Sequence, residues 1–110
     1  MHLAILFENI VKKYPFNTAL AYEEQVITYA ELDMQSSVVM AQLQGRNIGI
    51  GSRVGLLFNN PINFIITLLA VVKSSAIYVP FDSRDSSENI LSLCKLTHID
   101  NFLHDNSTLD

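Results

Sequence analysis

Three polar side chains follow predicted strands at positions where parallel sheets bind ligands. Asn59, Asp82 and Asp105 each come directly after a short apolar run. Ligands of doubly wound sheets bind beyond the carboxyl ends of the strands, so carboxylates and an amide there could orient a polar substrate. Asn and Asp are also favoured in loops and helix caps. We therefore expect these residues to serve loop structure rather than ligand binding.

The residue types that ligate metals are scattered along the chain. His2, His98 and His104 stand at no metal-ligand spacing from Cys94 or from one another. Structural zinc sites are often built on paired cysteines, and this chain has a single cysteine. We therefore expect no metal site.

Cys94 could act as a nucleophile or as a core residue. His98 follows one helical turn later, so a thiol–imidazole pair is conceivable, but a reactive thiol needs an electropositive, partly exposed setting. Ile90 and Leu91 place Cys94 on the inner side of a predicted helix, where cysteine behaves as a small hydrophobe. We expect the second role, and we assign no catalytic, cofactor-binding or metal-binding residue.

Gly45, Gly49 and Gly51 suggest a comparison with a dinucleotide-binding loop. That loop follows a strand and opens a helix, whereas these glycines follow a predicted helix and precede a predicted strand. We expect them to form the turn between the two elements, with Gly45 as the left-handed residue that ends the helix.

Hydrophobic periodicity predicts the elements that position these residues. Helices are expected over residues 3–14, 28–45, 62–73 and from Ser86 or Ser87 through Cys94, and strands over 18–22, 26–29, 53–58, 76–79 and 101–104. Thr28 and Glu31 stand at the spacing of a capping box, and Asn60 with Pro61 starts the next helix. Alternating strands and helices predict an α/β fold, a partial doubly wound parallel sheet with a small antiparallel hairpin.

Composition indicates one domain with few charged residues to cover its surface. Of the 110 residues, 49% are hydrophobic and only 16% are charged, against about 25% charged in an average domain. Some apolar surface is therefore expected to face a partner. A net charge of -4 disfavours nucleic acid. The lack of a signal peptide or membrane span, together with the single cysteine, favours the cytoplasm.

Four segments together resemble the adenylate-forming (AMP-binding) enzymes, in particular the adenylation domains of nonribosomal peptide synthetases. Residues 27–32, Ile-Thr-Tyr-Ala-Glu-Leu, resemble the first core motif, and residues 72–82, ending in Tyr-Val-Pro-Phe-Asp, resemble the second. Between them, residues 51–57 resemble the Gly-Asp-Arg-Val strand and residues 60–73 the long helix that follows. The order and spacing agree without gaps from about residue 7 to 105.

The sequence departs from the family pattern at three places. Ser74 and Ser75 stand where Ala-Gly is usual, and Ser83 replaces a common proline. Residues 86–89 lack the usual Pro and Arg that open the following helix. Asp82 makes the sequence more similar to the amino-acid-activating members of the family, which prefer Asp at that position.

The resemblance implies that residues 1–105 form the N-terminal subdomain of an adenylation-type domain, followed by a polar tail at 106–110. In relatives the phosphate loop, the ribose-binding acid, the magnesium-binding glutamate and the catalytic lysine all lie downstream. We therefore expect a truncated or split part of an ATP-dependent amino-acid- or carboxylate-activating enzyme that is inactive alone. ATP and Mg are expected only for the complete enzyme, and the partner is a complementary adenylation-domain fragment.

Two alternatives remain open at this point. The chain could be a non-catalytic interaction module that binds itself, as a homo-oligomer, or another chain through an exposed apolar face. It could also be an unrelated small α/β binding domain, in which case the ordered motif matches would be accidental.

Overall fold

The computed structural model describes residues 2–105, and its elements follow in the order that the sequence predicts. The helices are α1 (Leu3–Lys13), α2 (Tyr29–Gly45), α3 (Pro61–Lys73) and α4 (Ser87–Leu96), and the strands are β1 (Thr18–Tyr22), β2 (Gln25–Thr28), β3 (Arg53–Leu57), β4 (Ile77–Phe81) and β5 (Asn101–His104). The tail predicted at 106–110 lies outside the described residues. Within residues 2–105, no helix has the length and apolar character needed to cross a bilayer.

The strands form two sheets. β4, β3 and β5 build a parallel sheet with β3 in the centre, and β1 pairs with β2 as a separate antiparallel hairpin. The predicted α/β class, parallel sheet and hairpin are therefore confirmed. Pro80 is compatible with β4 because β4 is an edge strand, where the missing N–H of proline breaks no ladder.

Helix caps fix the starts of the elements around the sheet. The Thr28 Oγ1 atom accepts a hydrogen bond from the Glu31 N–H at 3.1 Å, and Glu31 Oε1 accepts one from the Thr28 N–H at 2.9 Å, so the predicted capping box forms. Asn60 caps α3 and Ser86 caps α4. Each cap satisfies backbone donors that would otherwise lack partners.

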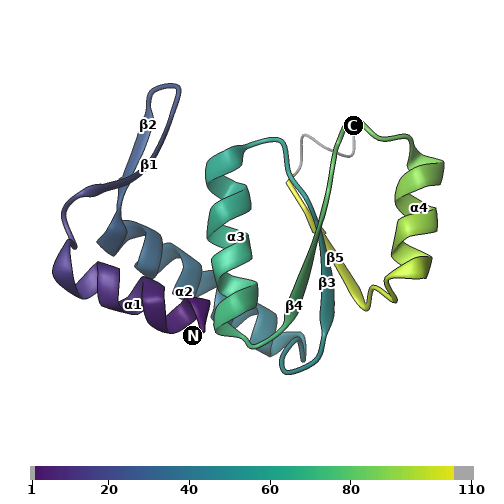
Figure 1. Cartoon of the computed structure of the whole chain (residues 1–110), viewed down its shortest axis with the longest axis horizontal. Coiled ribbons are helices and arrows are strands. Elements are labelled where there is room, and N and C mark those ends of the chain that lie inside the picture. Colours follow the sequence, from purple (N-terminus) through teal and green to yellow (C-terminus); the bar gives the residue numbers. More distant parts are fainter. Residues whose placement is uncertain (1, 106–110) are drawn as a thin grey trace.

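α3 lies at the centre of the molecule because it is apolar on most sides (Figure 1). Toward α1, α2 and the hairpin, Ile66 and Leu69 join one buried cluster. Toward the sheet, Ala70 and Val71 join a second buried cluster with residues of β3. The helix therefore has apolar neighbours on two sides, as its sequence predicts.

α4 covers the opposite face of the sheet only loosely (Figure 1). Ile90 and Cys94 are half-buried and line a cleft of about 560 Å³ beneath the helix. Leu91, expected on the inner side, lies at the rim with 62% of its surface exposed, so that expectation was wrong. No residue of α4 is buried, and the helix therefore contributes little to the core.

The turn after α2 differs from the sequence prediction. Gly45 is the last helical residue, and the left-handed conformation falls instead on Asn47, with a φ of 62°. The Ile48 N–H then donates to the Leu43 carbonyl at 3.0 Å, which closes the helix end. Asparagine takes this conformation more readily than most residues. Gly51, with a φ of 81°, does serve the turn into β3.

α3 ends at a left-handed serine. Ser75 has a φ of 60°, and its N–H donates to the Val72 carbonyl at 3.0 Å. This is the position where the family that the sequence resembles usually has glycine, which takes such a conformation without steric cost. A residue with a Cβ atom there costs about 1–2 kcal/mol.

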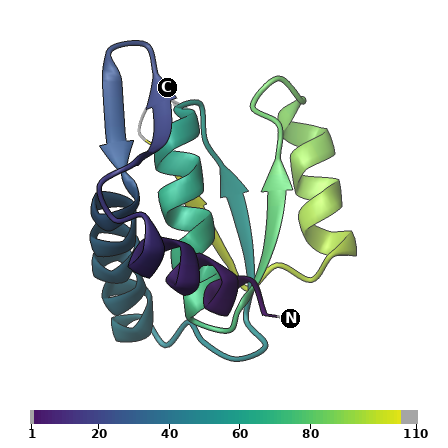
Figure 2. The same ribbon diagram turned by 60° about the vertical axis from the view of Figure 1, so that its left-hand side comes forward.

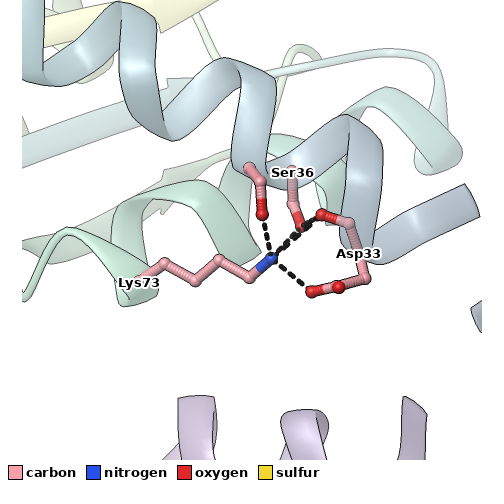
Figure 3. Close-up of polar contacts among 4 residues, drawn as sticks. Asp33, Ser36 and Lys73 are labelled. Atoms are coloured by element: carbon pink, nitrogen blue, oxygen red, sulfur yellow. Dashed lines mark hydrogen bonds and ion pairs between the residues drawn. The ribbon is translucent and has the colours of Figure 1, made fainter. Parts of the chain in front are cut away.

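Lys73 joins α3 to α2 through a nearly buried ammonium group. Four oxygens lie within hydrogen-bonding distance of Nζ: Asp33 O at 3.1 Å, Asp33 Oδ1 at 2.8 Å, Ser36 Oγ at 2.7 Å and Ser37 Oγ at 3.0 Å (Figure 3). Only 13% of the Lys73 side chain is exposed. Nζ also lies 5.5 Å from the centre of the Phe7 ring on α1, within the range of cation–π attraction. One side chain thus ties three helices together.

We predict that Lys73→Met lowers the free energy of unfolding by about 2–3 kcal/mol, because the methionine keeps the apolar stem but loses charge-assisted hydrogen bonds. Lys12→Met is the control, since Lys12 pairs with Glu8 at the surface and should change stability by less than about 0.5 kcal/mol. Urea denaturation measures both variants. Equal stability of Lys73→Met and the parent protein would show that desolvation of the ammonium cancels its hydrogen bonds.

We predict that Ser75→Gly raises the free energy of unfolding by about 0.5–1 kcal/mol, because relief of the left-handed strain exceeds the added flexibility of the unfolded chain. Ser83→Gly is the matched control, since Ser83 does not have a positive φ and its replacement should only cost stability. Thermal denaturation of the two variants should therefore shift in opposite directions. A loss of stability in Ser75→Gly would contradict the prediction.

Candidate functional site

The loops after β3 and β4 leave the sheet in different directions, and a cleft forms between them. β3 continues into α3 on one face, whereas β4 continues toward α4 on the other (Figure 2). Neighbouring parallel strands with diverging connections create the crevice where open α/β sheets bind ligands. The cleft here has a volume of about 450 Å³. Its walls are Phe58, Asn59, Pro61, Phe64, Pro80, Phe81, Asp82 and Ser83.

Two of the three polar residues singled out by the sequence meet in this cleft. Asn59 and Asp82 both line it, from the ends of β3 and β4 respectively. Asp105 lies outside the cleft wall but contacts the same loop from the end of β5. The carboxyl ends of the three parallel strands therefore bring all three residues to one edge of the sheet.

Asp105 fastens the loop that precedes α3. Its Oδ2 atom accepts hydrogen bonds from the backbone N–H of Asn59 at 3.0 Å and of Asn60 at 3.1 Å. These donors lie 46 and 45 residues away in sequence. The carboxylate thus holds the end of β5 against the start of α3, a structural role within the candidate site.

Asp82 is engaged by the arginine two residues later. Its Oδ1 accepts from the Arg84 backbone N–H at 2.9 Å, and its Oδ2 accepts from Arg84 Nη2 at 2.7 Å. These side-chain and backbone hydrogen bonds lower the pKa of Asp82 from its ordinary 3.8 to about 2. The cleft therefore carries a carboxylate that is ionised at neutral pH and bound to a guanidinium.

A wider groove adjoins the cleft on the side of α2 and has a volume of about 830 Å³. Val39, Phe58 and Ile66 give it an apolar interior, whereas Met34 and Val38 stand at its edge with 61% and 55% of their surfaces exposed. His104 and Asp105, at the end of the described chain, also line it. The groove is larger than the neighbouring cleft, and both adjoin the carboxyl edge of the sheet.

The histidines and the cysteine are dispersed over the fold. His2 Nδ1 accepts from the Ala4 N–H at 3.1 Å and caps α1, and His104 Nδ1 lies 3.1 Å from the Asp105 carbonyl. His98 takes a left-handed conformation after α4. Among residues 2–105 no hydrogen bond joins Cys94 to His98, and no three His, Cys, Asp or Glu residues gather as a possible metal site.

Sequence reasoning missed the apolar walls of the cleft. Phe58 and Phe64 lie with ring centroids 6.4 Å apart, and the sequence offered only their positions beside Asn59 and on α3 as a signal. The presence of glycine at position 55, beneath the cleft, has a steric explanation. A Cβ atom there would lie 2.9 Å from ring carbons of Phe81 and Phe102. Only glycine lets these two rings approach, with centroids 5.6 Å apart.

Comparison with known proteins gives a consistent family assignment. The family model described as AMP-binding enzyme matches residues 7–108. The chain is 33% identical over 105 residues to the PKS-NRPS hybrid synthetase acdB of Aspergillus candidus, covering 96% of this chain and 4% of that protein. It is 34% identical over 93 residues to tyrocidine synthase 2 of Brevibacillus parabrevis, covering 84% and 2%. The chain thus spans a small fraction of these relatives.

The fold matches solved structures of an N-terminal subdomain. The N-terminal subdomain of NpsA from Klebsiella oxytoca superposes with a TM-score of 0.92 at 26% identity, covering 96% of this chain and 28% of that chain. The same subdomain in complex with 3-hydroxyanthranilyl-AMSN gives a TM-score of 0.93, with 97% and 28% covered. O-succinylbenzoate coenzyme A synthetase of Bacillus subtilis shares the fold with a TM-score of 0.87 at 23% identity, covering 92% and 26%.

We predict that the Asp82 carboxyl titrates with a midpoint of about pH 2 in the folded protein, and that Arg84→Gln returns it toward the ordinary 3.8. Because the folded pKa is lowered, the stabilisation from this pair is complete above about pH 4 and is lost as the pH falls through 2. Carboxyl ¹³C chemical shifts measure the midpoint. Arg46→Gln is the control and should leave it unchanged, whereas an unaltered midpoint in Arg84→Gln would refute the assigned cause.

Proposed function

The chain belongs to the AMP-binding enzyme family, and we propose that it supplies the N-terminal part of an ATP-dependent enzyme that activates an amino acid or another carboxylate by adenylation. The observation that carries the proposal is the match of nearly the whole chain to the NpsA N-terminal subdomain together with a share of only 28% of that chain. The curated relatives include nonribosomal peptide and hybrid synthetases. The fragment corresponds to the first part of an adenylation domain.

The role proposed for the chain is that of a scaffold. Adenylation needs positioned donors around the phosphates and Mg²⁺. The carboxylates at the carboxyl edge of the sheet are instead bound to the protein itself: Asp105 to two backbone N–H groups and Asp82 to Arg84. This arrangement supports a segment that forms one wall of a larger site. We propose that ATP and Mg²⁺ bind only in the complete enzyme.

A complementary fragment of the adenylation domain is the proposed partner. The 830 Å³ groove between α2 and α3 has an apolar interior, and exposed Met34 and Val38 at its edge favour contact with further protein. Asp82 supports an amino acid as substrate, because the amino-acid-activating members that the sequence resembles prefer Asp there. We also propose a cytoplasmic location, since Cys94 is a free thiol.

We predict that the chain alone catalyses no ATP–pyrophosphate exchange and shows no heat of binding with ATP and Mg²⁺ in calorimetry, because the groups that hold phosphates are expected in the complementary fragment. Exchange should appear when the chain is mixed with a fragment carrying the remainder of an adenylation domain, and that fragment alone is the control. Micromolar ATP binding by the isolated chain would contradict the scaffold role, and a complementary fragment active by itself would show that this chain is dispensable.

A further inference from the structure

α4 forms one end of the molecule and presents a face that no described residue covers. In Figure 1 the helix stands at the extremity of the longest axis, with the sheet on its inner side. Leu91 and Leu96 expose 62% and 75% of their surfaces. The two leucines are five residues apart and therefore point to different sides of the helix. Leu91, at the middle of α4, gives the centre of the helix an exposed apolar contact point.

The charges on this face are arranged symmetrically about the middle of the helix. Glu88 and Lys95 are seven residues apart, which is about two helical turns, so they lie on the same face. Leu91 and Ser92 lie between them at spacings of three and four residues from each charge, and so share that face. All four side chains are exposed.

Glu88 and Lys95 have no ionic partner among the residues that the structure describes. The ion pairs found over residues 2–105 are Lys12 with Glu8, Lys73 with Asp33 and Arg84 with Asp82. Within α4 itself the two charges cannot meet, because two helical turns separate them by about 10 Å along the axis. An acid at one end and a base at the other remain available to a second molecule.

We propose that this face of α4 binds a second copy of the chain, with the two α4 helices packed antiparallel about a two-fold axis. That axis passes between Leu91 and Ser92, so Glu88 of each copy faces Lys95 of the other and the two ion pairs form reciprocally. Leu91 of each copy supplies the apolar contact and packs against Ser92 of the other, whose small side chain lets the helices approach at the crossing point. The inference goes beyond the proposed function, which needs no second copy.

The expected contact is weak and its charges fix orientation. A helix of ten residues is about 15 Å long, so the buried area falls at or below the roughly 1,200 Å² of transient complexes. Exposed ion pairs contribute about 0.2–1 kcal/mol each, and their main effect is on register and on the exclusion of other arrangements. The dimer should therefore form in about the hundred-micromolar range.

Charge reversal tests the arrangement. Sedimentation velocity from about 10 μM to 1 mM, under reducing conditions, should show a dimer of the 12.3 kDa chain. E88K and K95E each place like charges opposite one another twice and should weaken association about tenfold, whereas the double variant E88K/K95E should restore it. The control pair E8K and K12E on α1 should leave association unchanged. A monomer at 1 mM, singles without effect or a double variant that stays weakened would each overturn the proposal.

A cross-link fixes the face independently of charge. In a Cys94→Ser background, Ser92→Cys should form a disulfide between two copies on mild oxidation, because the two-fold axis passes directly beside position 92 and brings the two cysteines close together. Leu93→Cys in the same background lies on the opposite side of α4 from the face of Glu88, Leu91, Ser92 and Lys95, and should cross-link much more slowly. Equal rates for the two variants would show that association does not use this face.

Discussion

The arrangement of the helical layer depends on the ammonium group of Lys73. Removing a cation from water costs several kcal/mol, and the cost is recovered only when oxygens replace the hydration shell. Asp33, Ser36 and Ser37 provide those oxygens from one stretch of α2, so the end of α3 can bury its lysine in one orientation only. Ser36 is fully buried and small, which lets the two helices approach. The last turn of α3 also favours a cation through the helix dipole.

This attachment determines where the sheet and its loops lie. α3 holds an apolar cluster on each side, one with the first two helices and the hairpin and one with β3. The N-terminus of α3, capped by Asn60, lies at the carboxyl edge of the sheet. There the Asp105 carboxylate accepts hydrogen bonds from two backbone N–H groups of the loop that precedes α3. The candidate cleft is thus bounded by groups that already have partners. A wall of this kind is well ordered but offers few free polar groups to a ligand.

The two faces of the sheet are covered unequally, and this inequality separates the stable part of the molecule from the part available to other chains. Three helices lie on the side of α3, whereas α4 alone lies on the other side and buries no residue. Elements with few buried contacts open at lower free energy than the core. Exposed apolar side chains occur at α4 and at the groove beside α2, the two places where we propose contacts with further protein, and also on α1 and at Phe16 and Ile50.

Local sequence determined the elements, their order and the family. The capping box at Thr28, the cap at Asn60 and the apolar character of α3 act over one to four residues, and each was confirmed where the sequence placed it. Parallel pairing followed from the alternation of strands and helices. Contacts between segments distant in sequence decided how the helices and the loops of the candidate site are held together. Asp105 contacts Asn59 across 46 residues, and Lys73 contacts Asp33 across 40. The exposure of Leu91 and the shift of the left-handed turn from Gly45 to Asn47 also followed from packing, because both depend on where the neighbouring element lies and not on the residue type alone.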